Sequence, residues 1–181
     1  IIDIAQYYRY IGGKGDVVAG KKSLALAAGY ELNHPATAVR ACGFDGYWLI
    51  AQSYSTPNPF LAFRIDADGL NLTPVTSMVA SGGSIINTLK CAPNGRMLVR
   101  SGFNNNSPLH LLKFNPANGE VTDLLNLTMP YYKYFGVEYS ADSRYLYATT
   151  SYQYFIETRL LQFDLSSYDQ ELIKGSHRII A

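Results

Sequence analysis

The residues that could carry acid–base or nucleophilic chemistry are few and scattered along this 181-residue chain. The histidines are His34, His110 and His177, and the cysteines are Cys42 and Cys91. A nucleophilic hydrolase places a serine or cysteine beside a histidine, and a local sequence signature commonly marks the nucleophile. No such signature accompanies these histidines, so the sequence does not favour hydrolase chemistry and assigns no catalytic residue.

Carboxylates could instead form the catalytic pair of a glycosidase, which works across a central site. Most aspartates lie in turn segments, where a side-chain bond to the backbone explains them; they are Asp45, Asp66, Asp68, Asp142 and Asp164. Glu138 is an exception because it lies in a strand-like run. Arg40 and Lys90 lie in comparable runs. These three residues are candidates for lining a central axis.

A repeated strand–turn–strand pattern must position all of these residues. The clearest copy runs from Tyr134 to Leu165, where alternating apolar residues are interrupted by the turn Ser140-Ala-Asp-Ser143. The same pattern surrounds the turns Cys42–Gly46 and Cys91–Gly95. Strand-forming residues punctuated by such turns predict antiparallel hairpins.

Three markers keep one period of about 50 residues, which is typical of four-stranded propeller blades. The first marker is a turn residue, at Asp45, Asn94 and Asp142. The second is a leucine four positions later, at Leu49, Leu98 and Leu146. The third is a phenylalanine towards the end of the next strand, at Phe63, Phe114 and Phe163. No stretch has a sustained helical period, so we predict almost no helix.

The fold class predicted is all-β, as a partial β-propeller of about three four-stranded blades. The outer strands of an incomplete blade occupy 1–36, and the blades occupy 37–82, 83–130 and 131–181, with Glu171–Ala181 as the last outermost strand. Propellers have about four to eight blades. We therefore expect further blades, in the same parent protein or supplied by another chain.

The two cysteines stand at what we take to be equivalent positions of successive blades, where the third copy has Tyr139. Equivalent side chains on neighbouring sheets point the same way, whereas a disulfide needs converging Cβ atoms. We expect Cys42 and Cys91 to be buried free thiols, with a disulfide as the less favoured alternative. No histidine lies at ligand spacing from them, so we expect no metal and no cofactor.

One end of each blade, here called the loop face, carries the connections between second and third strands and between blades. Aromatic residues beside amides gather in these segments: Tyr54, Asn58, Phe103, Asn104, Asn105, Tyr131, Tyr132, Tyr152 and Tyr154. Such surfaces suit stacking and hydrogen bonding to a glycan or an extended peptide. Alternatively, the rings cover the loop ends and the asparagines supply positive φ in turns.

Composition narrows the function classes. Charged residues make up 16% of the chain and the formal net charge is +1, so no basic field favours a nucleic-acid partner. No apolar run reaches about 18 residues, so no membrane-spanning helix is predicted. The chain opens in the strand-like run Ile1-Ile-Asp-Ile4, and we expect the natural N-terminus to lie upstream.

Several motifs resemble a known family. They are Gly12-Gly-Lys-Gly-Asp-Val-Val18, Thr37-Ala-Val-Arg40, Gly46-Tyr-Trp-Leu-Ile-Ala51, Phe135–Tyr147 and Leu161-Gln-Phe-Asp-Leu-Ser166. This order is similar to the WD40-like propeller region of large secreted proteins that end in gliding-motility-associated or type IX secretion sorting domains. Ala141 and Ser143 replace the proline and glycine usual in that family's turn. The resemblance implies a secreted or cell-surface bacterial protein whose propeller serves interaction, and it carries over no catalytic residue.

The function expected is a non-enzymatic interaction module that binds a partner protein or a glycan through its loop face. The alternative is a propeller enzyme or sugar-binding subunit whose axial site is completed by missing blades, with Arg40, Lys90 and Glu138 converging on the ligand. A third possibility is an architectural spacer, in which the aromatic loops are packed rather than exposed.

Overall fold

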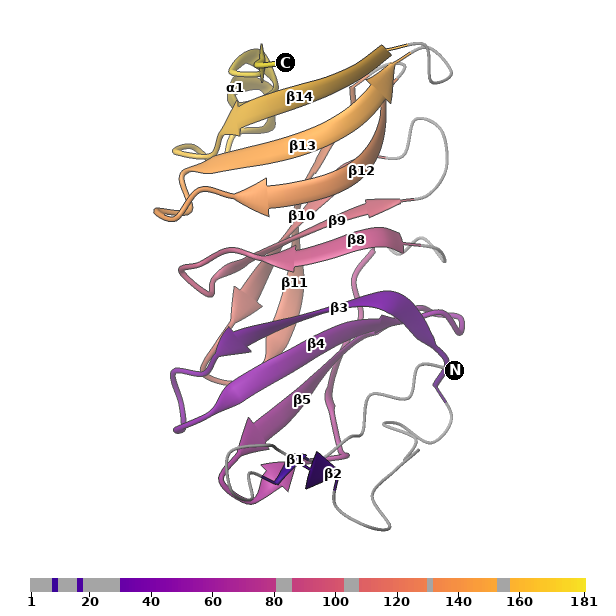
Figure 1. Cartoon of the computed structure of the whole chain (residues 1–181), viewed down its shortest axis with the longest axis vertical. Coiled ribbons are helices and arrows are strands. Elements are labelled where there is room, and N and C mark those ends of the chain that lie inside the picture. The colour runs from indigo at the N-terminus through magenta and orange to yellow at the C-terminus, as the bar shows by residue number, and fades with distance from the viewer. Residues whose placement is uncertain are drawn as a thin grey trace.

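The computed structural model describes residues 8–9, 16–17, 30–80, 86–102, 108–129, 132–152 and 157–181 (Figure 1). The strands are β1 (Tyr8–Arg9), β2 (Asp16–Val17), β3 (Leu32–Arg40), β4 (Tyr47–Ser53), β5 (Phe60–Asp66), β6 (Gly69–Leu70), β7 (Val75–Ser77), β8 (Ile86–Cys91), β9 (Met97–Gly102), β10 (Leu109–Asn115), β11 (Glu120–Leu127), β12 (Tyr132–Tyr139), β13 (Tyr145–Tyr152), β14 (Glu157–Asp164) and β15 (Arg178–Ile179). One short helix, α1 (Gln170–Gly175), completes the described elements. The predicted all-β class is confirmed.

Three antiparallel sheets follow one another along the chain. In the first sheet β3, β4 and β5 are joined in order, and β6 and β7 both pair with β5. The middle sheet has the order β8-β9-β10-β11 and the last sheet the order β12-β13-β14-β15, so neighbours in sequence are neighbours in space. A separate pair, β1 and β2, precedes them. None of the described helices is long and apolar enough to cross a membrane.

The hairpin turns close as their residue types predict. In the middle sheet the Ala92 N–H donates to the Met97 carbonyl at 2.8 Å, and in the last sheet the Ser140 N–H donates to the Tyr145 carbonyl at the same distance. The turn markers supply side-chain acceptors: Asn94 Oδ1 accepts from the Arg96 N–H at 2.9 Å. These local bonds explain why the turns were recognisable from sequence alone.

The leucine markers Leu98 and Leu146 are the first paired residues after their turns, whereas Leu49 lies two residues beyond the corresponding residue, Tyr47. One phenylalanine marker is also displaced. Leu49 lies opposite Phe63 and Leu146 opposite Phe163. In the middle sheet Leu112, not Phe114, faces Leu98. Phe114 sits two residues further along β10, where its N–H bonds to the Arg96 carbonyl at 2.9 Å. Spacing alone could not separate these two positions, because both side chains point to the same face of the strand.

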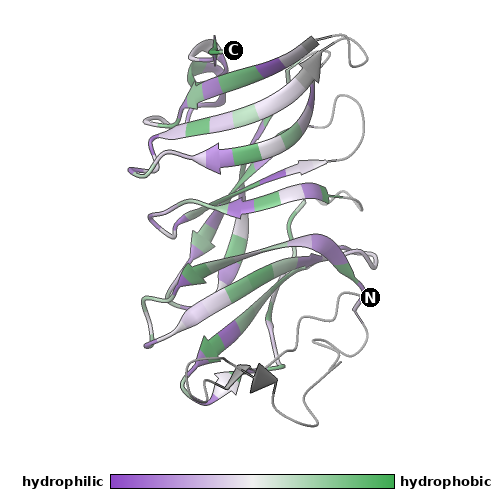
Figure 2. Ribbon diagram, in the orientation of Figure 1, coloured by the Kyte–Doolittle hydropathy of each residue, from purple (hydrophilic) through white to green (hydrophobic). Residues whose placement is uncertain are grey.

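Each face of the middle sheet is buried against a neighbour, and the strands carry both polar and apolar residues along their length (Figure 2). The core between the first and middle sheets includes Trp48, Ile50, Phe60, Leu98, Leu112 and Phe114. The core between the middle and last sheets includes Met97, Val99, Leu111, Leu146, Leu161 and Phe163. Leu98 therefore faces the first sheet while its neighbours in β9 face the last.

The sheets stack with the same orientation, so that the same face of each sheet points towards the sheet that precedes it in the chain. Leu98 faces the preceding first sheet and Leu146 faces the preceding middle sheet. Leu49 packs with Leu61 and Phe63 in a third cluster, which excludes every residue of the middle sheet. Along the stack, β3 lies beside β8 and β8 lies beside β12 (Figure 1).

The C-terminal segment departs from the prediction of one long outer strand over Glu171–Ala181. Residues 170–175 form α1, and only β15 pairs with β14. The Asp169 carboxylate accepts hydrogen bonds from the Glu171 and Leu172 N–H groups, both at 2.9 Å. This N-cap stabilises the first turn, and Ile173 is buried in the core between the middle and last sheets. The N-cap at Asp169 therefore favours a helix over residues 170–175, although the composition of this segment predicted a strand.

Trp48 joins the first sheet to the middle sheet. Its side chain is 5% exposed, and its indole N–H donates to the Pro116 carbonyl at 2.9 Å. The ring lies over Gly119, where an added Cβ would come within 2.9 Å of it. Gly119 also has a φ of 81°, so both space and backbone require glycine there.

Trp48→Ala should lower the free energy of unfolding by about 3–5 kcal/mol, because it removes a buried ring and its hydrogen bond between two sheets. The matched control is Tyr47→Ala, since Tyr47 is the next residue in the chain and is 51% exposed. Its expected cost is below about 1 kcal/mol. Urea unfolding of both variants gives the comparison, and equal losses would contradict the packing described.

Candidate functional site

Part of the predicted loop face lies outside the described residues: Phe103, Asn104, Asn105, Tyr131 and Tyr154. The backbone of Tyr132 and Tyr152 is described. These two residues face each other in the β12–β13 ladder, at the end of the last sheet that bears the loops. The fold therefore brings two residues that are distant in sequence to one edge of the loop face.

Tyr54 and Asn58 lie in the loop between β4 and β5. Tyr54 is an exposed aromatic residue of this loop. Asn58 is only 9% exposed and has a φ of 61°. Its amide donates to the Tyr54 carbonyl at 2.7 Å. Asn58 therefore holds the turn, as the alternative interpretation of the asparagines expects, while Tyr54 is available for contact.

Two of the three axis candidates meet. Lys90 Nζ on β8 lies 2.6 Å from Glu138 Oε2 on β12, which joins the first strands of the middle and last sheets. Both side chains are partly exposed, so the pair contributes about 1 kcal/mol or less. Arg40 does not join them. Its guanidinium lies 3.2 Å from Asp45 Oδ1 in the turn of its own hairpin.

The position of β3 that matches this ion pair carries an uncharged residue. Counted from the turn, Lys90 faces Val99, Glu138 faces Tyr147 and Val39 faces Trp48 in the corresponding hairpins. Thr37 Oγ1 accepts a hydrogen bond from the Cys91 N–H at 3.2 Å. The first strands of the three sheets are thus joined by polar contacts, from β3 to β8 and from β8 to β12.

Both cysteines are free thiols, as expected, but they are not equivalent. Cys91 lies opposite Leu98, as Tyr139 lies opposite Leu146, and burial raises the pKa of its thiol to about 12. Cys42 lies beyond the end of β3 and is exposed, so its predicted burial is wrong. Its N–H donates to the Pro116 carbonyl at 2.9 Å, which ties this turn to the β10–β11 turn.

A buried charge between the first and middle sheets was not anticipated. Arg100 is 1% exposed, and its Nη1 donates to Gln52 Oε1 at 3.2 Å. Burial lowers the pKa of Arg100 to about 10, which still leaves it charged at neutral pH. The sequence signal was an arginine in the apolar run Met97-Leu-Val-Arg100, a position that strand alternation alone does not distinguish from an exposed one.

His110 lies opposite Arg100 in the β9–β10 ladder. Burial lowers the pKa of His110 to about 4, and the Arg100 guanidinium lowers it further, while a hydrogen bond with Asn126 opposes the shift. The imidazole is therefore neutral at physiological pH.

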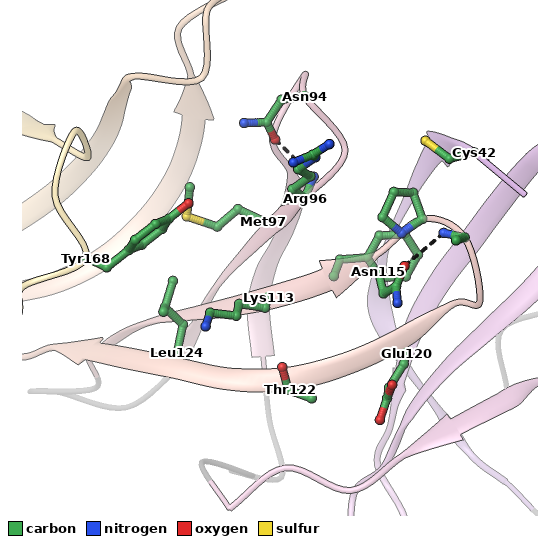
Figure 3. A pocket seen from close by; sticks show the side chains of 13 residues that line it. Cys42, Asn94, Arg96, Met97, Lys113, Asn115, Glu120, Thr122, Leu124 and Tyr168 are labelled. Carbon is green, nitrogen blue, oxygen red and sulfur yellow. Dashed lines mark hydrogen bonds between the residues drawn. The ribbon is translucent and has the colours of Figure 1, made fainter.

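A pocket of about 630 Å³ opens at the end of the middle sheet opposite the loop face, and we call it the turn-side pocket (Figure 3). One wall is the β8–β9 turn with Asn94 and Arg96. The floor is formed by β10 and β11, including Lys113 and Thr122. Tyr168, from the segment that joins β14 to α1, approaches from the side of the last sheet.

The turn-side pocket combines apolar and polar groups and has the size usual for small-ligand sites. Met97, Phe114 and Leu124 supply apolar surface, and Glu120 supplies a carboxylate. Cys42 also lines it. In the described part of the chain, no group of three or more histidine, cysteine and acidic residues could hold a metal ion. Sequence reasoning recognised Asn94 as a turn residue but missed the pocket, because its walls come from separate hairpins.

The low pKa of His110 predicts a specific loss of stability in acid. An unfolded histidine binds a proton near pH 6.5, whereas folded His110 does so only near pH 4. The neutral side chain therefore contributes stability that is complete above about pH 6.5 and is lost as pH falls towards 4.

His110→Gln, which cannot titrate, should flatten the fall of Tm between pH 6.5 and pH 4.5 relative to the unaltered chain. The control is His34→Gln, because His34 is exposed and should leave the profile unchanged. Thermal unfolding followed by circular dichroism gives both profiles. A His110→Gln profile as steep as that of the unaltered chain would contradict the account.

Comparison with protein-family models and with curated proteins finds no match for this chain. The resemblance to secreted WD40-like propellers therefore rests on the motifs in the sequence, and the function must be argued from the geometry.

Proposed function

We propose that this chain forms three consecutive blades of a β-propeller and acts as a non-enzymatic binding module. The observation that supports this best is the stacking of three antiparallel meanders in one sense, with β3, β8 and β12 side by side. Propeller blades are four-stranded meanders arranged in this way around a central axis. Further blades, from the same parent protein or from another chain, complete the ring.

The far face of the last sheet supports continuation of the ring. Met97 and Val99 in β9 contact the next sheet. The corresponding residues of β13, Tyr145 and Tyr147, point away from the middle sheet and are half-buried. Leu160 lies on the same face. A blade normally has neighbours on both faces, and this face of tyrosines and leucine suits one.

The setting we propose is a secreted or cell-surface bacterial protein, in keeping with the motifs that resemble the gliding-motility-associated family. Its ligand is a glycan or a partner protein bound at the loop face. Support comes from the exposed ring of Tyr54 and from the pairing of Tyr132 with Tyr152 at the same end of the strands. Aromatic rings beside amides provide stacking area together with hydrogen bonds.

The alternative, an enzyme with an axial site, has less support. Lys90 and Glu138 neutralise each other, and Arg40 is paired with Asp45. The three candidates therefore do not converge as a catalytic set. A general acid or base needs a pKa matched to its task and an open path to the substrate.

The test is a glycan array followed by mass spectrometry of the bound oligosaccharide. We expect saturable binding, recovery of the oligosaccharide with unchanged mass, and about fivefold weaker binding by Tyr54→Ala, because stacking on an aromatic ring contributes about 1 kcal/mol. Tyr47→Ala is the control, since Tyr47 is exposed at the opposite end of the same strand. Shortened products would favour the enzyme, and binding insensitive to Tyr54→Ala would exclude this part of the loop face.

A further inference from the structure

The turn-side pocket is a second candidate site, remote from the loop face. It lies where the β8–β9 and β10–β11 turns meet the segment between β14 and α1 (Figure 3). The loop-face segments lie at the other ends of the same strands. A ligand in the turn-side pocket would therefore not touch Tyr54.

The asparagines of the pocket present donors. Asn94 Oδ1 accepts from the Arg96 N–H at 2.9 Å, and Asn115 Oδ1 accepts from the Ala117 N–H at 3.0 Å (Figure 3). Because each side-chain oxygen is used to close its own turn, the group left for a ligand is the NH₂. Two amide donors therefore lie on the rim of the pocket.

Two cationic side chains add further hydrogen-bond donors to the pocket. Arg96 and Lys113 are exposed, and within the described residues neither forms an ion pair. Several other cations are paired with carboxylates, as Arg144 is with Asp164 at 2.9 Å. Glu120 is the one carboxylate among the lining residues, and it lies 3.5 Å from the Asn118 amide. The pocket thus has an excess of donors and of positive charge.

An aromatic surface completes the pocket. Tyr168 is 68% exposed, so a large aromatic ring is left accessible to solvent beside the pocket. Met97 and Leu124 provide further apolar surface beside it. A flat ring next to several donors matches a pyranose, which has an apolar face and a rim of oxygen acceptors.

We propose that the turn-side pocket binds an acidic saccharide, in which a pyranose ring carries a carboxylate. Lys113 and Arg96 bind the carboxylate, Tyr168 packs against the sugar ring, and the amides of Asn94 and Asn115 donate to its hydroxyl groups. An extended acidic peptide would instead pair with β11, the edge strand of the middle sheet, and leave the exposed ring of Tyr168 unused. The exposed ring therefore favours the saccharide, and oligoglutamate serves as the competing ligand in the test.

The probe is an oligogalacturonate, compared by isothermal titration with a neutral oligosaccharide of the same length at physiological ionic strength. We expect the neutral sugar to bind at least about tenfold more weakly, because it lacks the charge-assisted bonds. Lys113→Met should reduce oligogalacturonate affinity at least about tenfold, whereas Lys113→Arg should retain most of it, since the charge is kept.

Arg178→Gln is the matched control, because it removes an exposed cation on β15, outside the pocket, and should leave affinity unchanged. Tyr54→Ala should also leave it unchanged, which separates this site from the loop face. Equal losses in Lys113→Met and Arg178→Gln would show unspecific charge attraction and overturn the proposal. Equal binding of the neutral sugar, equally tight binding of oligoglutamate, or no binding of oligogalacturonate would overturn it as well.

Discussion

The arrangement of this molecule depends on covering both faces of the middle sheet. The residues of β9 are buried without interruption from Met97 to Ser101, so neither of its faces can meet water. Leu98 needs the first sheet, while Met97 and Val99 need the last. A sheet that is apolar on both faces cannot be stable alone, because burial of apolar area is the main favourable term in folding.

Directional bonds then set how the sheets sit on one another. Between the middle and last sheets, the Asn87 amide donates to the Phe135 carbonyl at 3.1 Å, and Thr88 Oγ1 donates to the same oxygen at 2.5 Å. Between the first and middle sheets, Arg100 donates to Gln52. Hydrophobic packing is not directional, whereas hydrogen bonds have narrow geometry. The polar contacts therefore favour one orientation among the many that burial would permit.

Local features of the fold were predictable from the sequence, and features that depend on contacts between sheets were not. The turns at Asn94 and Asp142 were recognisable because side-chain bonds to the nearby backbone define them. The burial of Arg100 and the exposure of Cys42 depend on which neighbour covers each position, and strand alternation carries no such information. The α1 helix was missed because its signal is a single cap at Asp169 over less than two turns.

The candidate sites divide in the same way. The loop face could be proposed from composition, because aromatic residues and amides collect in the connecting segments. The turn-side pocket could not, since Asn94, Lys113 and Tyr168 come from three separate parts of the chain and meet only when the sheets stack. The two candidate sites therefore lie at opposite ends of the stacked sheets. The hydrogen-bond donors of the turn-side pocket belong to described residues, whereas much of the loop face does not.

The first strands of the middle and last sheets, β8 and β12, lie side by side, and the Lys90–Glu138 distance of 2.6 Å makes this arrangement directly measurable. A carbodiimide forms an amide only between a lysine and a carboxylate in contact, and tandem mass spectrometry identifies the joined peptides. We predict a Lys90–Glu138 cross-link in the folded chain that is absent in urea and in Lys90→Arg. The Lys174–Glu171 pair of α1, at 3.0 Å, is the internal positive control. A folded chain that yields the control cross-link but not Lys90–Glu138 would contradict the stacking of the sheets.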